Sequence, residues 1–130
     1  MHVYKARVYF SDTDAGGIAY HARYLDWAEH ARTEMIRSLL PAFKQESVRN
    51  MGFVFVVRSI NIDYFLPAYL DDEIRVETEM EKLGAVSGIV HQCIYRDDTL
   101  LSELRIKVAF IDSNTKKPAK LPSELIKALS

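Results

Sequence analysis

The sequence predicts an α+β domain in which one antiparallel sheet packs against a single, mostly buried helix. Two patterns predict this class. Apolar and polar side chains alternate in several short segments, and one long segment near the N-terminus repeats its apolar residues at helical spacing. Short turns join the later strands, which favours antiparallel pairing. With 130 residues, 48% of them hydrophobic, the chain is expected to form one domain over residues 1–130.

The first expected element is a strand over residues 2–11, in which side chains alternate between two faces. One face would carry Tyr4, Ala6, Val8 and Phe10. The segment from Asp12 to Gly17 is then expected to be a turn, because aspartate and glycine accept the backbone angles that turns require.

A long helix is expected next, over residues 22–40. Apolar side chains recur there every three or four residues and form a broad stripe: Leu25, Ala28, Ala31, Met35 and Leu39, widened by Tyr24, Trp27, Ile36 and Leu40. Most of this helix should therefore be buried. Pro41 is expected to end it, and residues 43–50 suggest a second, short helix.

Four further strands are expected over residues 54–64, 73–82, 86–96 and 99–112, followed by a terminal helix over 122–129. A tight turn at Asp97-Asp98 is typical of a hairpin. In the strand over 54–64, one face is expected to carry Val54, Val56, Ile60, Ile62 and Tyr64, with Arg58 as an interruption. In the last strand the inward side chains should be Leu104, Ile106, Val108 and Phe110.

The composition excludes several classes of protein. Lys plus Arg total 17 and Asp plus Glu total 18, so the net charge of −1 lacks the basic excess of a nucleic-acid binder. The longest fully apolar run, Phe53–Val57, is far too short to cross a bilayer. No signal peptide is visible, and Cys93 is the only cysteine, which suits a reducing compartment. A cytoplasmic location is therefore expected.

The ten residues from Asp12 to His21 combine features that acyl transfer needs. Carboxylates stand at the end of a strand, two glycines let the backbone approach a ligand closely, and the start of a helix follows. Backbone N–H groups at a helix N-terminus can stabilise a developing oxyanion while a carboxylate attacks a carbonyl or activates water. The alternative interpretation is structural, because an aspartate before a helix is commonly a cap.

Both in this segment and over nearly its whole length, the sequence resembles the 4-hydroxybenzoyl-CoA thioesterase-like hotdog proteins. The matching positions are Arg7-Val8, Thr13-Asp14, Gly17-Ile18, His21, Tyr24, Trp27, Glu29, Ala31-Arg32, Ile62, Tyr64, Pro67-Ala68, Leu70-Asp71-Asp72, Thr115, Lys117-Pro118 and Leu121-Pro122. The Asp-Thr-Asp-Ala-Gly-Gly run is most similar to the small acyl-CoA thioesterases associated with the Tol–Pal system of Gram-negative bacteria.

The resemblance implies a hotdog fold, in which a five-stranded antiparallel sheet wraps around one long helix. It also implies that two subunits pair into one longer sheet with the active site at their interface, and that such homodimers often pair into tetramers. The implied reaction is hydrolysis of an acyl-CoA thioester to a free carboxylic acid and CoA. No cofactor is expected, since CoA is part of the substrate and product. An acyl carrier protein could present the acyl group instead.

The resemblance also assigns roles within the motif. Asp14 is the implied catalytic carboxylate, either as the nucleophile or as the general base. His21 is implied at the helix start, where its backbone N–H would polarise the thioester carbonyl, and its imidazole is a further candidate group. Gly17 and Tyr20 are expected to contact the substrate, with a pure turn role as the alternative for Gly17.

Two other carboxylates are backup candidates. Asp12 could instead cap the turn, and Glu29 on the helix could instead form an ion pair. One position departs from the subfamily, which often carries tyrosine four residues before the catalytic aspartate. Phe10 stands there, so a contribution from that hydroxyl would be absent, and the adjacent Tyr9 is expected on the other face of the strand.

No metal site is expected, because neither His30 nor His91 has two further ligands at metal spacing. Cys93 is expected to be a small core residue rather than a nucleophile. Two alternative functions remain open. One is a non-catalytic protein, linked to envelope assembly, that binds acyl-CoA or acyl carrier protein. The other is a hotdog dehydratase, which ranks lower because no His-Phe-Pro-Gly-like stretch is present.

Overall fold

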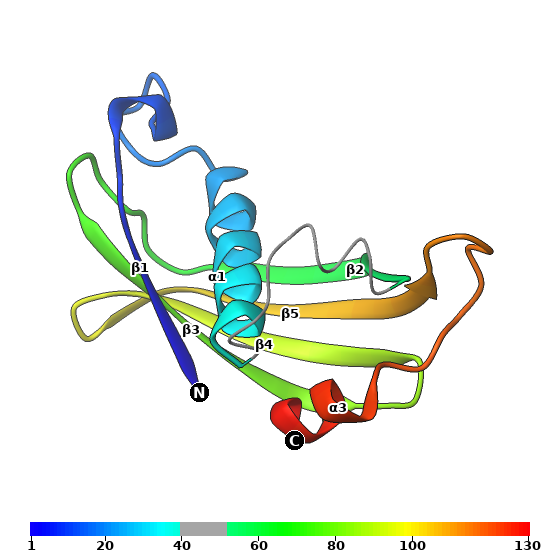
Figure 1. Cartoon of the computed structure of the whole chain (residues 1–130). Helices are drawn as coiled ribbons and strands as arrows, with labels where there is room; N and C mark the ends of the chain where they lie inside the picture. Colours follow the sequence, from blue (N-terminus) through cyan, green and yellow to red (C-terminus); the bar gives the residue numbers. More distant parts are fainter. Residues whose placement is uncertain (40–51) are drawn as a thin grey trace.

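One antiparallel sheet of five strands forms the framework of the molecule (Figure 1). The computed structural model describes residues 1–39 and 52–130. The strands are β1 (His2–Arg7), β2 (Phe53–Tyr64), β3 (Glu73–Leu83), β4 (Ser87–Arg96) and β5 (Thr99–Asp112). Their order across the sheet is β1-β3-β4-β5-β2, and each neighbouring pair is antiparallel. The predicted α+β class and five-stranded sheet are confirmed.

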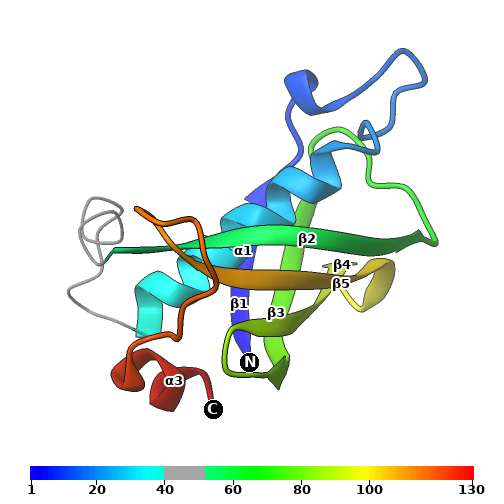
Figure 2. The same cartoon turned by 90° about the vertical axis from the view of Figure 1, so that its right-hand side faces the viewer.

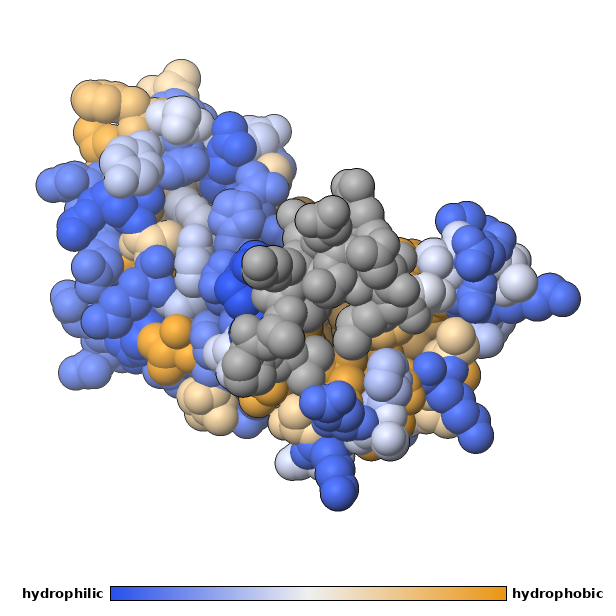
Figure 3. All heavy atoms as spheres, in the orientation of Figure 1, coloured by the Kyte–Doolittle hydropathy of each residue, from blue (hydrophilic) through white to orange (hydrophobic). Residues whose placement is uncertain are grey.

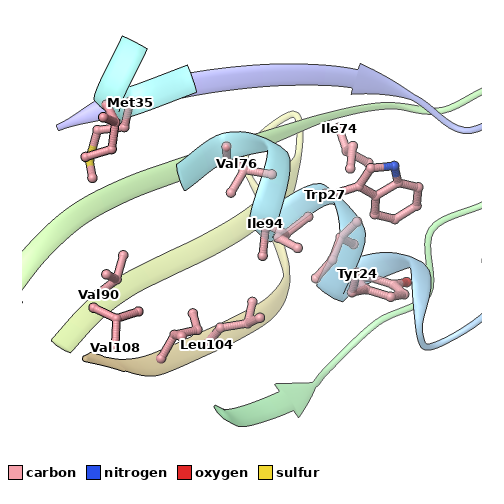
Figure 4. Packing of buried hydrophobic residues seen from close by; sticks show 14 of the residues in the cluster. Tyr24, Trp27, Met35, Ile74, Val76, Val90, Ile94, Leu104 and Val108 are labelled. Carbon is pink, nitrogen blue, oxygen red and sulfur yellow. The ribbon is translucent and has the colours of Figure 1, made fainter. Parts of the chain in front are cut away.

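Helix α1 (Arg23–Leu39) lies across one face of this sheet (Figures 1 and 2). Its apolar side packs on the inward side chains of β3, β4 and β5 (Figure 4). The buried residues of the helix are Tyr24, Trp27, Ala28, Ala31, Met35 and Ile36. The predicted broad stripe is therefore confirmed, and burial of this stripe rather than helix propensity is what stabilises the helix. The expected stop at Leu40 and Pro41 and the short helix over 43–50 lie outside the described residues.

Strand β1 is shorter than the alternation predicts. It ends at Arg7, and Phe10–Asp12 form a short 3₁₀ helix, η1. Phe10 is 80% exposed and does not continue the core-facing row. The prediction of a strand through residue 11 is wrong because alternation continues in the sequence beyond the last residue that pairs with β3.

Strand β2 also differs from the prediction, because Arg58 forms a bulge. Val57 pairs with Val108 and Ser59 with Lys107, so Arg58 has no partner across the ladder. A bulge of one residue exchanges the two faces of a strand. Before Arg58 the core-facing positions are therefore Phe53, Phe55 and Val57, whereas after it they are Ile60, Ile62 and Tyr64. Val54 and Val56 lie on the outer face, and their predicted place beside Ile62 is wrong.

A buried polar network joins α1 to the sheet. Gln92 of β4 is completely buried, and its side-chain nitrogen donates to the Ala28 carbonyl and to the Thr78 hydroxyl, each at 2.9 Å. The Gln92 side-chain oxygen accepts a hydrogen bond from Arg32 at 3.0 Å. Burial lowers the pKa of Arg32. Each buried polar group in this network has a partner, which avoids the cost of leaving it unsatisfied.

The remaining elements follow the predictions closely. The β4–β5 hairpin turns at Asp97, whose φ is 51°. Leu104, Ile106, Val108 and Phe110 of β5 face the core. Helix α3 (Ser123–Leu129) closes the described chain and buries Leu125. None of the helices in residues 1–39 and 52–130 combines the length and apolar character that a membrane span requires.

Candidate active site

The loop between β1 and α1 is a tight hairpin built from the Asp-Thr-Asp-Ala-Gly-Gly run. Thr13 and Ala19 form an isolated antiparallel bridge, and the Asp14 N–H donates to the Ile18 carbonyl at 3.0 Å. The Gly17 N–H donates to the Asp14 carbonyl at 3.1 Å. These bonds hold the backbone on both sides of Asp14 and so fix the direction from which its side chain leaves the loop.

A second set of bonds ties this hairpin to the connection between β2 and β3. Ile18 forms a bridge with Tyr69, and the Ala19 N–H donates to the Ala68 carbonyl at 2.9 Å. The Ala68 N–H in turn donates to the hydroxyl of Tyr24 in α1 at 2.9 Å. Two loops and the first turn of α1 are therefore linked at one end of the molecule.

The Asp14 carboxylate lies in an exposed position with one oxygen anchored. Its Oδ1 accepts the backbone N–H of Gly16 at 2.8 Å. A side chain at position 16 would crowd this contact, because a Cβ there would lie 3.2 Å from Oδ1. Within residues 1–39 and 52–130, Oδ2 has no hydrogen-bond partner. One oxygen can thus orient the group while the other reacts.

Gly17 has a backbone reason to be glycine. Its φ is +79°, in the left-handed region that other residues seldom adopt, whereas a Cβ there would meet no atom within 4 Å. The structure therefore supports the alternative role of Gly17, which is to allow the turn. The contact with substrate that was also expected of Gly17 stays a prediction.

The start of α1 offers backbone donors near this loop. The helix begins at Arg23, whose N–H donates to the Tyr20 carbonyl at 2.9 Å. The N–H groups of His21 and Ala22 donate to no acceptor within the described ranges 1–39 and 52–130. The hydroxyl of Tyr64 donates to the His21 carbonyl at 2.8 Å and fixes this turn from β2. Free donors at a rigid helix start are the feature that an oxyanion site requires.

Asp12 has a structural role. Its Oδ2 accepts the backbone N–H of Tyr9 at 2.9 Å, and its Oδ1 lies 3.8 Å from Arg23 Nε. Asp12 therefore caps η1 and helps to hold the start of α1, as its alternative role predicts. The expectation that Tyr9 faces the other side of a strand is wrong, because the strand has already ended.

Glu29 and Tyr20 also occupy defined places. Glu29 is exposed on α1, accepts a hydrogen bond from Thr33 at 2.9 Å and lies 3.9 Å from His30. These contacts agree with its structural alternative. Tyr20 is 46% exposed beside His21, with the two ring centroids 4.4 Å apart. Its side chain and the His21 imidazole are thus open at the surface, and their catalytic or binding roles stay predictions.

Apolar side chains are unusually exposed around this end of the molecule. The group consists of Tyr9, Phe10, Tyr20, Tyr64, Phe65, Leu66, Tyr69 and Leu70, each 38–80% exposed. Figure 3 shows a small group of hydrophobic atoms, surrounded by hydrophilic ones, at the upper left, where Figure 1 places η1 and the loop that follows it. Contiguous exposed apolar surface on a protein is typical of an interaction site.

A cluster on the outer face of the sheet departs from the sequence predictions. Cys93 is half-buried among polar side chains instead of lying in the core. His91 Nε2 lies 2.8 Å from Glu103 and 3.6 Å from Cys93 Sγ. The premise that His91 lacks two further metal-ligand groups is therefore wrong. Sequence spacing did not reveal it because the β4–β5 pairing brings Glu103 opposite Cys93.

Two positioning residues were missed by reasoning from the motif alone. Gly16 supplies the N–H that anchors Asp14, and Tyr64 holds the His21 carbonyl. The paired glycines after Asp14 could have indicated the role of Gly16. Nothing local to Tyr64 points to the second, because the contact spans 43 residues of sequence.

Comparison with known proteins agrees with this geometry. Residues 8–129 match the family model of the thioesterase-like superfamily. The chain is 41% identical over 123 residues to the acyl-CoA thioesterase YbgC of Haemophilus influenzae, with 94% of this chain and 89% of that protein covered. It is 34% identical over 138 residues to the acyl-CoA thioesterase YbgC of Helicobacter pylori, with 96% and 99% covered.

A solved structure of similar fold extends the comparison. A hypothetical protein from Aquifex aeolicus superposes with a TM-score of 0.90 at 27% identity, with 98% of each chain covered. Its agreement covers the whole sheet-and-helix framework described above. The match of the family model to residues 8–129, together with relatives of 34–41% identity, shows that the chain belongs to the thioesterase-like superfamily of hotdog proteins.

Proposed function

We propose that this protein hydrolyses acyl-CoA thioesters to a free carboxylic acid and CoA, with Asp14 as the reacting carboxylate. Its family makes the chain a thioester hydrolase, and the relatives named acyl-CoA thioesterases support CoA as the carrier. The observation that carries the proposal is the Asp14 carboxylate, held through one oxygen by the Gly16 N–H and unpartnered at the other within the described chain.

Two courses of reaction are consistent with this carboxylate. As a nucleophile, Asp14 attacks the thioester carbonyl carbon, CoA leaves as its thiolate, and water hydrolyses the mixed anhydride. As a general base, Asp14 takes a proton from water, whose oxygen attacks the same carbon. In both courses the carbonyl oxygen gains negative charge, and the free N–H of His21 is the donor proposed to stabilise it. Both courses consume water alone and need no cofactor.

The proposed working unit is a homodimer that can pair further into a tetramer. Strand β2 lies at one edge of the sheet, is twelve residues long and leads directly into the exposed apolar residues at the active-site end. An unpaired edge presents a row of free backbone groups that a second copy can satisfy. We place the subunit contact along β2, where it would cover Phe65 and Leu66 and enclose the substrate.

The finer assignments rest on the family resemblance. We propose a cytoplasmic enzyme associated with the Tol–Pal system, which acts on acyl-CoA or on acyl groups presented by an acyl carrier protein. A non-catalytic binding role is the principal rival. The Asp14 carboxylate argues against it, since binding alone does not need a reactive carboxylate at the helix start.

The decisive experiment measures thiol release from a panel of short-chain, long-chain and aromatic acyl-CoAs by the wild type and by Asp14→Asn. We expect Asp14→Asn to lower kcat by about 10²–10⁴-fold because the amide can neither attack nor accept the proton. Glu29→Gln is the matched control and should retain most activity. Asp12→Asn can still accept the Tyr9 N–H and should lose far less activity than Asp14→Asn. Wild-type turnover by Asp14→Asn would refute the assignment, and absence of turnover by the wild type on every chain would favour the binding role.

A labelling experiment tests for the nucleophilic course of reaction. After many turnovers in ¹⁸O-water, mass spectrometry of the peptide containing Asp14 would reveal ¹⁸O in its carboxylate if water opens the anhydride at the aspartyl carbon. Labelled Asp14 would establish the nucleophilic course. General-base catalysis places the label in the product acid and leaves Asp14 unlabelled.

A further inference from the structure

A compact set of metal-ligand groups lies on the outer face of the sheet, opposite the face that packs against α1. It consists of His91 and Cys93 of β4 and Glu103 of β5. One ligand atom from each lies within 4.8 Å of the other two. The strands dictate this arrangement, because residues two apart on β4 share a face and Cys93 pairs with Glu103 across the ladder.

The spacing of the nitrogen and sulfur atoms suits a tetrahedral ion. With Zn–N near 2.0–2.1 Å and Zn–S near 2.3 Å, two such ligands in a tetrahedron stand about 3.6 Å apart. His91 Nε2 and Cys93 Sγ are 3.6 Å apart. The Glu103 oxygen, now 2.8 Å from Nε2, would have to retreat by roughly half an ångström to reach the separation of about 3.3 Å that nitrogen and oxygen ligands adopt.

Neighbouring groups already orient two of the three side chains, His91 and Glu103. Glu79 Oε1 lies 3.2 Å from His91 Nδ1. A carboxylate that accepts the Nδ1–H is the usual support of a metal-bound histidine. Nε2 now donates its own N–H to Glu103, and its lone pair becomes available to an ion when that proton leaves. Arg105 lies 3.9 Å from Glu103 Oε1, so that the Oε2 atom turns toward His91. Two of the three proposed ligands are therefore held in place by their neighbours.

We propose that His91 Nε2, Cys93 Sγ and Glu103 Oε2 bind one Zn²⁺ ion, with Glu79 as the hydrogen-bond partner of the histidine. A thiolate, an imidazole and a carboxylate form a ligand set that zinc accepts, whereas Mg²⁺ and Ca²⁺ prefer oxygen ligands alone. When the ion binds, the Cys93 thiol and the His91 Nε2–H that now faces Glu103 each release a proton to solvent as the sulfur–metal and nitrogen–metal bonds form. The ion would join β4 to β5 and leave one coordination position to water.

The test uses tag-free, metal-depleted protein titrated with Co²⁺ and Zn²⁺. A thiolate ligand gives cobalt an intense near-ultraviolet charge-transfer band, and tetrahedral geometry gives strong visible bands. We expect one equivalent of Co²⁺ to produce both, and Zn²⁺ to displace it and raise the Tm. Cys93→Ser should abolish the charge-transfer band, and His91→Gln and Glu103→Gln should each weaken binding at least tenfold.

Two further variants make the result specific. His30→Gln is the matched control, because this exposed histidine on α1 lies outside the cluster, and it should bind as the wild type does. Glu79→Gln keeps all three ligands and should weaken binding about 10–100-fold through the histidine. This variant carries the test if Cys93→Ser fails to fold. Absence of the charge-transfer band in the wild type, or wild-type affinity in both Cys93→Ser and His91→Gln, would overturn the proposal.

Discussion

Asp12 and Asp14 show how two identical side chains, two residues apart, acquire different roles. Both carboxylates accept a backbone N–H, but Asp12 also meets Arg23 and closes a cap, whereas one oxygen of Asp14 is without a partner in the described chain. The family resemblance ordered the two candidates, because it implies that the second aspartate of the motif is the catalytic carboxylate. It could not identify Gly16 as the anchor, since that bond depends on the folded shape of the loop.

Tyr64 is the residue through which β2 acts on the proposed oxyanion donors. Tyr64→Phe removes the 2.8 Å hydrogen bond to the His21 carbonyl while keeping the ring packed against Tyr24, with centroids 5.1 Å apart. We expect a loss of about 1 kcal/mol in the free energy of unfolding, with little effect on the core. Because a loosened helix start misplaces the donors, kcat should fall about tenfold with KM nearly unchanged.

Steady-state kinetics and chemical denaturation check this expectation together. Tyr95→Phe provides the control. Tyr95 lies on β4, where its ring packs against the Arg75 guanidinium at 4.7 Å from the ring centroid and not against the start of α1. A Tyr64→Phe enzyme with wild-type kcat would show that the His21 turn does not need this bond.

Among the elements, α1 illustrates what periodicity can and cannot predict. The stripe of apolar residues identified the buried face correctly, because a helix on a sheet must bury one side. Arg32 also belongs to this helix, yet its guanidinium is partly buried and donates a hydrogen bond to the side chain of Gln92. This hydrogen bond depends on which strand packs against the helix, and the sequence of the helix alone does not specify that strand.

The Arg32–Gln92 contact should couple α1 to β4 energetically. We expect Arg32→Met and Gln92→Leu each to destabilise the fold by about 1–3 kcal/mol, because each leaves a buried polar partner unsatisfied. The double variant should lose less than the sum, with a coupling energy of about 1–2 kcal/mol, because both partners are then apolar.

Urea unfolding of the four proteins in this cycle measures the coupling. Arg37→Met combined with Gln92→Leu is the comparison, since Arg37 lies in the last turn of α1 and pairs with Glu34 at 3.3 Å. That pair of substitutions should be additive. Strict additivity for Arg32 and Gln92 as well would mean that their hydrogen bond contributes nothing beyond each residue alone.

At the scale of the whole molecule, the exposed apolar residues at the active-site end and the edge strand β2 both favour a subunit contact at that side of the sheet. Phe65 is 53% exposed directly after β2. If a second copy covers it, Phe65→Asp should raise the Kd of the dimer about thirtyfold or more, as expected when a charge replaces a central aromatic anchor. Thioesterase activity should fall in parallel, because each proposed site needs both subunits.

Light scattering coupled to size-exclusion chromatography, over a range of protein concentrations, follows the dimer directly. Val86→Asp supplies the control, since Val86 is 37% exposed in the turn between β3 and β4. A Phe65→Asp protein with the mass and activity of the wild type would place the subunit contact elsewhere.

At this scale the sequence predicted the architecture more fully than the details. Alternation and turn residues were enough for the number of strands and for the buried face of β5, because these follow from local spacing. The face exchange at Arg58 and the meeting of His91, Cys93 and Glu103 were not predictable in this way. Both arise from how strands align across the ladder, which no single segment specifies.

The position of β2 beside β5 has a consequence for the order of events in folding. β3, β4 and β5 are consecutive in the chain, and each pairs with the next. They can therefore form a meander by closing only short loops. Among the described strands, β2 precedes them but pairs with β5 alone, and β5 is the last of the five to be synthesised. While a ribosome is still adding residues 99–112, the apolar side chains of β2 have no neighbour in the sheet. The slowest and most aggregation-prone step should therefore be the docking of β2, the same strand on which assembly of two subunits is proposed to depend.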